Sequence, residues 1–292
     1  MTQYQLDVLY RRLGGWLDSS SSFLMDLVDQ DAKPLALIRR DNSIHLLVND
    51  FVYFCVAKSC KSLNAIILLI EDELPEDAII ILRSLYENYL SMAYVIQNPT
   101  SVEHFIYKRI GLSRGHLQHP ITSKGKRNTR KIYNPKTGET LPFGLSISEL
   151  SRGTSNEIDV ELHQEVYSYF CEHVHANMVA SGNYRREPEM TYSYNEPGNC
   201  LQARFYAALV ITLFFQELSL FPLLPKKKKN IALSLSRKAC PILRRGIKIL
   251  DFATMESLQS VISKRLNSFY EANSGDIMPN HGLSSADFPS GR

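Results

Sequence analysis

Apolar residues recur at spacings of three and four along most of the chain, which is the periodicity of an α-helix. The clearest case is residues 44–70, whose repeating apolar positions include Ile44, Leu47, Val48, Phe51, Phe54 and Cys55. A second helix is predicted over residues 76–97, between Pro75 and the Asn98-Pro99 pair. Because the connection between them is short, we expect the two helices to form an antiparallel hairpin.

The same periodicity predicts helices on both sides of this hairpin. Residues 1–31 are amphipathic but interrupted by Gly14-Gly15 and a serine run, which indicates a peripheral helical element. The later predicted helices are residues 101–118, 146–150, 158–180, 201–220, 231–250 and 255–270, with breaks near Cys240-Pro241 and Asp251. No alternating β pattern is evident. The sequence therefore predicts an all-α protein, an irregular helical bundle around a long antiparallel helix hairpin.

Changes in composition divide the chain into four parts. The expected parts are an N-terminal helical extension (1–40), a helical core (41–220), C-terminal helices (221–272) and a flexible tail (273–292). Residues 184–200 combine proline and glycine with tyrosines and are expected to form an irregular connector.

Two stretches concentrate positive charge. Residues 120–144 are rich in Lys, Arg, Gly and Pro, which predicts a long exposed basic loop with a small hairpin around 134–138. Its candidate nucleic-acid contacts are Lys124, Lys126, Arg127, Arg130 and Lys131. The second stretch, four lysines at 226–229, fits either a solvated helix start or a phosphate-contacting patch.

Overall composition narrows the class of protein. With 292 residues and 44% hydrophobic content, the chain can bury a core, and its net charge of +3 neither requires nor excludes a polyanionic partner. Five cysteines without a CxxC pair argue against a disulfide framework or a zinc ribbon and fit a reducing cytosol. The N-terminus has no secretory pattern, and the apolar run 205–215 is shorter than the roughly 20 residues that cross a bilayer. We therefore expect a cytoplasmic protein with no membrane partner.

The first candidate for chemistry is Arg83 with Glu87, four residues apart on one face of the predicted 76–97 helix. A later helix carries His173 and His175, which are two residues apart and point to different sides. A carboxylate that orients an imidazole supports general acid–base catalysis, and an arginine binds phosphate. The candidate catalytic set is thus Arg83, Glu87 and His175, and the alternative is a structural Arg-Glu pair inside the bundle.

A second candidate set, which is also the alternative catalytic pair, is Arg109 with His116, overlapped by Arg114 with His119, immediately before the basic loop. It fits a cationic nucleic-acid surface, and the alternative is an ordinary solvated face.

Metal and thiol chemistry are less well supported. A four-helix di-iron site needs Glu-x-x-His on two helices, and the chain has it once, at Glu172 and His175. Cys171 lies on the apolar stripe of its helix, which favours a core thiol over a nucleophile. Phosphate-loop, GxSxG, GxGxxG and HExxH motifs are missing from the sequence. We therefore expect no metal and no cofactor.

The segments 75–99 and 166–177 resemble a family of bacterial helical proteins of unassigned function. In that family an Arg-x-x-x-Glu helix is paired with a later helix ending in Val-His, and the matching residues here are Arg83, Glu87 and His175. The resemblance covers roughly residues 41–183. More distantly, the helical hairpin is similar to the HEPN superfamily, whose nucleases carry Arg, four to six residues, then His on one helix. The 109–119 segment has that spacing but contains two glycines.

The HEPN resemblance implies a metal-independent ribonuclease, in which arginine and histidine assist attack of a ribose 2′-hydroxyl on the adjacent phosphate. It also implies RNA as a partner, a site shared across a homodimer, and an antitoxin or defence partner protein. The expected function is a HEPN-like RNA-directed protein, a defence or toxin ribonuclease. The alternative is a non-enzymatic helical interaction or regulatory protein whose Arg-Glu-His network is structural. Convergence of these residues at an open cleft would favour the first hypothesis, and a sealed network the second.

Overall fold

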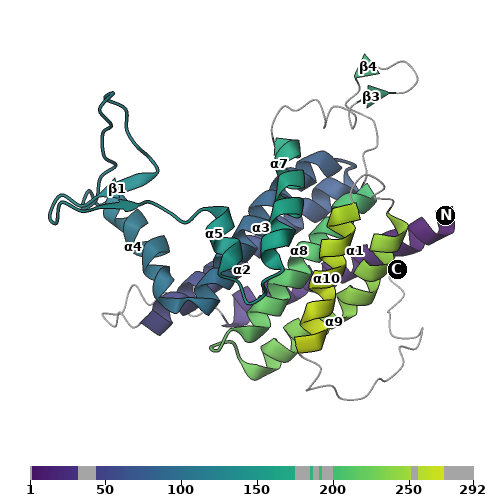
Figure 1. The fold of residues 1–292 in the computed structure, drawn as a ribbon. Coiled ribbons are helices and arrows are strands. Elements are labelled where there is room, and N and C mark those ends of the chain that lie inside the picture. Colours follow the sequence, from purple (N-terminus) through teal and green to yellow (C-terminus); the bar gives the residue numbers. More distant parts are fainter. Residues whose placement is uncertain are drawn as a thin grey trace.

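The computed structural model describes residues 2–31, 44–174, 185–186, 191–192, 200–250 and 256–272. Helices packed against one another make up most of this part of the chain, which confirms the predicted all-α helical bundle (Figure 1). The α-helices are α1 (Gln3–Asp26), α2 (Ile44–Glu71), α3 (Pro75–Gln97), α4 (Val102–Ser113), α5 (Ile147–Arg152), α6 (Asp159–Leu162), α7 (Ser168–Val174), α8 (Cys200–Leu220), α9 (Lys226–Ile249) and α10 (Glu256–Ala272). The shorter elements are the π-helical turns η1 (Leu27–Asp31) and η4 (His163–Tyr167), the 3₁₀ turn η3 (Pro99–Ser101), and strands β1 (Lys131–Tyr133), β2 (Thr140–Pro142), β3 (Arg185–Arg186) and β4 (Thr191–Tyr192).

Helices α2 and α3 form the predicted hairpin and pack along each other (Figure 1). Their tight turn is closed by the backbone N–H of Leu74, which donates to the Leu69 carbonyl at 2.8 Å. Pro75 is the first residue of α3, followed by two acidic residues that complement the positive end of the helix dipole. Local sequence signals therefore explain both the turn and the start of α3.

Helix α8 is the most enclosed helix of the bundle, and α1, α2, α3 and α9 all contact it. Its residues are buried continuously from Phe205 to Leu218, as expected for a helix that is apolar on every side. By length and composition alone, α8 and the Leu46–Glu71 part of α2 are long and apolar enough to cross a membrane. In the bundle, 83% of the apolar window of α8 and 39% of that of α2 are buried inside the protein.

The terminal helices complete the same core. Helix α1, expected to be peripheral, buries Leu9, Leu13 and Leu17 in one hydrophobic cluster with α8 and α9. The indole N–H of its Trp16 donates to the Leu235 carbonyl of α9 at 3.0 Å. The helical periodicity of α1 therefore reflects a buried stripe rather than a loosely attached extension.

Two predicted helix boundaries were wrong. Helix α9 continues through Pro241 instead of breaking there. Pro241 is exposed, so its ring lies on the solvent side of the helix and not against the core. Helix α4 ends at Ser113 rather than near residue 118, and Gly115 follows in a left-handed conformation (φ 72°), which glycine adopts without steric cost.

Two helical glycines are expected to respond oppositely to alanine. A methyl group on buried Gly246 would lie 2.7 Å from the Phe205 ring, where α9 approaches α8. We expect Gly246→Ala to lower the free energy of unfolding by about 1–3 kcal/mol through overpacking. No described atom lies within 4 Å of a methyl group placed on exposed Gly15. Gly15→Ala should therefore raise the free energy of unfolding by about 0.5–1 kcal/mol.

Urea denaturation of the two glycine variants beside the unchanged protein measures both effects. An unchanged or higher free energy of unfolding for Gly246→Ala would contradict the close packing of α9 on α8.

The basic loop is ordered and contains the predicted hairpin. Strands β1 and β2 pair antiparallel, with Ile132 opposite Leu141, and the Asn134 N–H donates to the Glu139 carbonyl at 2.9 Å. Figure 1 shows this segment projecting from the bundle beyond the end of α4. In the expected 184–200 connector, the structure describes the short antiparallel pair β3–β4. The predicted flexible tail, residues 273–292, lies outside the described residues.

Candidate functional site

Arg83 and Glu87 meet a third side chain, Tyr167, at a half-buried position. The Arg83 Nε and the Glu87 Oε1 are 3.2 Å apart, and the two side chains are 25% and 34% exposed. The Arg83 Nη2 donates to the Tyr167 hydroxyl at 3.0 Å, and that hydroxyl lies 2.8 Å from the Glu87 Oε1. Helix α3 supplies two of these groups, and the η4 turn supplies the third. The charged pair is therefore partly open to solvent, and a tyrosine holds it in place.

The electrostatics of this cluster define its protonation state. Partial burial opposes the charge on Arg83, but its hydrogen bond to Tyr167 and the nearby Glu87 carboxylate outweigh that effect and raise its pKa. Burial and the hydrogen bond to Glu87 raise the pKa of Tyr167 to about 12, although Arg83 acts in the opposite direction. Near neutral pH the arginine is therefore a cation and the tyrosine is a neutral phenol that donates a hydrogen bond to Glu87.

Tyr167 occupies the last position of the π-helical turn η4, and His163 occupies the first. Such wider turns often occur at functional sites. The His163 ring lies 4.9 Å from the Tyr167 ring and is stacked on Tyr86 at 6.4 Å. Burial lowers the pKa of His163, so its imidazole is neutral near pH 7. The packing of His163 against the Tyr167 ring thus helps to fix the position of Tyr167.

A cleft of about 750 Å³ opens beside this cluster, and Glu87 lines it. Its other charged residues are Asp50 and Lys58 of α2 and Arg109 of α4. Its aromatic residues are Phe51, Tyr53, Phe54, Phe105 and Phe143. The walls come from α2, α3, α4, α5 and the chain that follows β2. This α2–α4 cleft contains Glu87 and Arg109, which belong to two separate sequence-predicted sets.

The second predicted set is divided by the end of α4. Exposed Arg109 lies on the helix and places its guanidinium over the Phe143 ring, 5.7 Å from the centroid. His116 is exposed beyond the end of the helix and is not among the described residues that line the cleft. His119 contacts the other side of the loop, with its Nδ1 2.7 Å from the Lys131 carbonyl oxygen. Of this set, only Arg109 is among the described residues that line the cleft.

The basic loop adjoins the cleft. Lys108 of α4 donates to the Pro142 carbonyl at 2.7 Å, and the next residue of α4, Arg109, covers Phe143. All five basic residues predicted to contact nucleic acid are exposed: Lys124, Lys126, Arg127, Arg130 and Lys131. The exposed positive charge of the loop is thus connected to the Arg109 side of the cleft.

His175, the third member of the first set, lies outside the described residues, which end at Val174 in this region. Helix α7 carries the neighbouring His173, whose Nδ1 is 3.0 Å from the Tyr169 carbonyl oxygen. In the described part of the chain, no group of three or more His, Cys, Asp or Glu side chains is arranged to hold a metal ion.

The sealed ion pair of this protein is a different one, which the sequence did not predict. Arg265 of α10 and Asp159 of α6 are 1% and 0% exposed, and the Arg265 Nε donates to Asp159 at 2.6 Å. Tyr89 also donates to Asp159 at 2.6 Å, and Arg265 donates to Gln216 at 2.8 Å. Beside this network, burial raises the pKa of Glu217, a carboxyl group that Ser155 and Gln97 contact. This network joins α3, α6, α8 and α10. Because Arg265 and Asp159 are almost completely buried, its role is structural.

The sequence did not indicate the roles of Tyr167 in the Arg83 cluster or of Asp159 in the buried network. Tyr167 lies on an apolar stripe, so its spacing predicted a core position, and the only available signal was a polar atom on that stripe. Asp159 lies at the start of a predicted helix, where an acidic residue is ordinary. Pairing across more than 80 residues is not visible in helical periodicity.

The comparisons with known proteins cover the α2–α4 cleft and the Arg83 cluster. No curated protein and no solved structure matches the chain. Just under half of the chain, residues 49–191, matches a family of unknown function, DUF5677. The matched range includes Arg83, Glu87, Arg109 and Tyr167 but not Arg265. Residues 49–191 are thus similar to an uncharacterised protein family.

Proposed function

We propose that this protein is RNA-directed and holds single-stranded RNA in the α2–α4 cleft, with the basic loop on the flanking phosphates. The observation that carries the proposal is the continuity of an aromatic cleft with an exposed cationic loop. Single-stranded nucleic acid is typically bound by aromatic rings that stack on bases, together with a positive track for the backbone.

The aromatic residues of the cleft suit stacking. The Phe54 side chain is 58% exposed although it lies on a core helix. Its neighbour Phe51 packs on Phe105 of α4, with ring centroids 5.0 Å apart. Exposed aromatic surface beside a packed aromatic floor provides a place for a base. Each base–aromatic stack contributes about 1–3 kcal/mol of affinity.

The distribution of charge sets the direction of the RNA. Two acidic residues, Asp50 and Glu87, and two basic residues, Lys58 and Arg109, line the cleft, so it has no excess of positive charge that would attract a run of phosphates. Arg109 lies over Phe143, a cleft residue that belongs to the basic loop, and the exposed basic residues of this loop attract phosphates. We therefore place the bases in the cleft, the phosphate that reacts beside Glu87, and the flanking phosphates along the loop.

The Arg83 cluster adds a cleavage chemistry to this binding site. Glu87 lines the cleft and accepts hydrogen bonds from Arg83 and Tyr167. In a metal-independent reaction, Glu87 takes the proton of the 2′-hydroxyl, and Arg83 stabilises charge on the phosphate. His175 supplies the proton to the leaving 5′-oxygen, so that a 2′,3′-cyclic phosphate forms as the P–O5′ bond breaks. The HEPN resemblance extends this proposal to a homodimer, to a defence or toxin role and to an antitoxin or defence partner.

A non-enzymatic interaction protein is the rival function. It is favoured by the way Arg83 is already engaged, since its guanidinium donates to both Tyr167 and Glu87. In that case RNA, or another partner, would bind without being cleaved.

RNA affinity, measured by fluorescence polarisation with a labelled single-stranded RNA, tests the binding site. Phe54→Ala is expected to weaken binding by about tenfold, because it removes one stacking surface. Arg109→Gln should also weaken binding and reduce its dependence on salt. The matched controls are Tyr107→Ala, an aromatic residue of α4 that is 40% exposed, and Arg11→Gln, an exposed arginine of α1.

Equal affinities for all four variants would overturn the cleft as the RNA site. Glutamine at all five predicted basic-loop positions provides an independent check. If RNA binding occurs at the loop rim, this variant should lose most of the salt dependence of its affinity.

A further inference from the structure

All the charged residues of helix α9 are basic. It holds nine of the 33 Lys and Arg residues of the protein and none of the 30 Asp and Glu residues. Several of its basic residues contact neighbouring segments: Lys228 pairs with Asp26 of α1, Lys229 donates to the Pro222 carbonyl at 3.2 Å, and Arg244 donates to the Asn267 side chain of α10 at 2.6 Å. The other basic residues lie toward solvent or on the rims of the helix.

The exposed side of α9 forms one stripe. Its residues recur at spacings of three and four: Lys227, Asn230, Ser234, Lys238, Pro241, Arg245 and Lys248. The opposite side buries Ala232, Ala239 and Leu243 in the core. We name the exposed stripe the α9 basic face. From Lys227 to Lys248 it extends about 30 Å, at 1.5 Å per residue.

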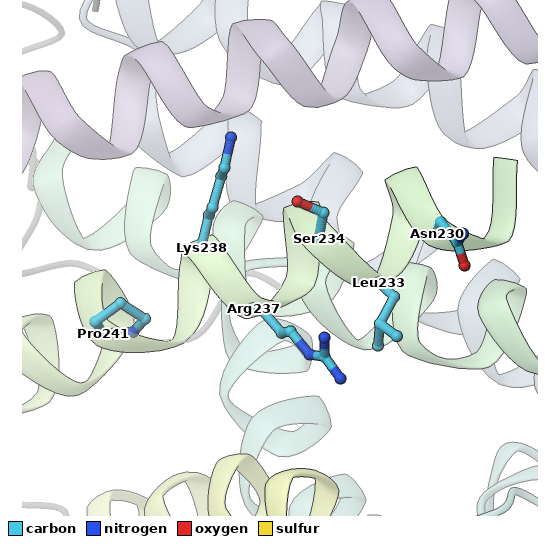
Figure 2. Close-up of a pocket in the computed structure, with 6 residues that line it drawn as sticks. All are labelled: Asn230, Leu233, Ser234, Arg237, Lys238 and Pro241. Carbon is cyan, nitrogen blue, oxygen red and sulfur yellow. The ribbon is translucent and has the colours of Figure 1, made fainter. Parts of the chain in front are cut away.

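A shallow depression of about 320 Å³ lies in the middle of the α9 basic face. Asn230, Ser234, Lys238 and Pro241 of the face line it, together with Leu233 and Arg237 (Figure 2). Figure 2 shows Arg237 and Lys238 extending from the helix in different directions, with Ser234 one turn away. Cationic groups beside amide and hydroxyl donors are the usual protein contacts of nucleic-acid phosphates.

We infer that the α9 basic face is a second RNA contact site, which binds the phosphate backbone of the RNA outside the α2–α4 cleft. This inference rests on the proposed function, because both sites bind the same polymer. A stripe about 30 Å long that carries Lys227, Lys238, Arg245 and Lys248 complements a linear polyanion, and its phosphate contacts carry no base specificity.

An anionic membrane fits this face less well. Interfacial helices insert large apolar side chains between lipids. The exposed large apolar residues of the described chain include none in α9, because the apolar side of this helix is buried against α8 and α1. Charge without exposed apolar anchors favours a phosphate polymer in water.

The two sites lie on different parts of the bundle. Helices α2, α3, α4 and α5 form the cleft, whereas α9 packs on α8, α1 and α10 (Figure 1). An RNA of about 6 nucleotides matches a single site, and one of about 30 nucleotides can span both, given site sizes of about 4–16 nucleotides for single-strand binding domains.

The test compares the double variant Lys238→Gln/Arg245→Gln with the control Arg11→Gln/Lys264→Gln, which removes the same charge from α1 and α10. Binding of the long RNA to the α9 double variant should weaken, and the slope of log Kd against log salt should fall by about 1.4. Its affinity for the short RNA should not change. The control should bind both RNAs as the unchanged protein does.

Three outcomes would overturn the inference. One is an equal loss in the control, which would indicate overall charge rather than this face. Another is unchanged binding of long RNA to the α9 variant while Phe54→Ala weakens it, which leaves the proposed function standing. The third is that the α9 double variant binds phosphatidylserine vesicles more weakly than the unchanged protein but binds both RNAs equally well, which would assign the face to a membrane. If the unchanged protein binds neither RNA, the proposed function fails as well.

Discussion

Replacing Arg265 with methionine is expected to lower the free energy of unfolding by about 3–5 kcal/mol. Arg265 and Asp159 are 1% and 0% exposed, so the change leaves a carboxylate inside the bundle without its cation. Tyr89 would still donate to Asp159, but a single phenol does not replace a charge-assisted pair. Asp159→Ala is expected to cost a similar amount, because it strands the guanidinium.

The neighbouring residue provides a matched control. Lys264 also lies on α10 and pairs with Glu161 at 3.6 Å, but these side chains are 57% and 56% exposed. Lys264→Ala should therefore change stability by no more than about 0.5 kcal/mol. Denaturant unfolding followed by circular dichroism measures all three variants. Similar costs at positions 264 and 265 would refute the structural role of the buried pair.

Glu87→Gln is expected to slow RNA cleavage by about 10²- to 10⁴-fold and to leave RNA affinity unchanged. Glutamine keeps an oxygen that accepts from Arg83 and Tyr167, but it cannot take a proton from the 2′-hydroxyl. The cluster is half-buried rather than sealed, so we expect little effect on folding. Single-turnover cleavage and binding of the same labelled RNA separate the two effects.

Three further variants show whether the loss is specific. Glu161→Gln, an exposed carboxylate on α6, should cleave at the unchanged rate. Tyr167→Phe removes the hydroxyl that holds Glu87 and should reduce the rate less than Glu87→Gln does. Cleavage by His175→Ala at the unchanged rate would remove His175 from the mechanism. If the unchanged protein binds RNA in the cleft without cleaving it, the non-enzymatic function is the correct one.

The two charged pairs illustrate what a sequence reveals about burial. Arg83 and Glu87 are charged residues in an otherwise apolar helix, and their spacing correctly placed them on one face. The structure leaves that face half-open beside the cleft. Arg265 lies on a more polar segment, yet α10 packs against α6 and closes over it. Burial depends on which helices cover a residue, and helical periodicity does not contain that information.

Both candidate sites changed through tertiary contacts. Glu87 and Arg109, assigned to separate sets, line one cleft because α4 packs against α2, which also pairs with α3. Arg109 and His116 separate because α4 ends at Ser113. Tyr167 joins the first set through the π-helical turn, which changes the direction of side chains relative to a regular helix.

By itself the sequence determined the all-α class, the α2–α3 hairpin, the apolar helix α8 and the basic hairpin loop. Each of these follows from local signals: apolar spacing, a short turn before a proline, and a run of basic and turn-forming residues. Only the tertiary structure decided that α1 and α9 complete the core, that Asp159 and Arg265 meet, and that the basic loop adjoins the cleft. These features arise from pairing between distant segments, where the free energy comes from surfaces that exist only after the helices have packed.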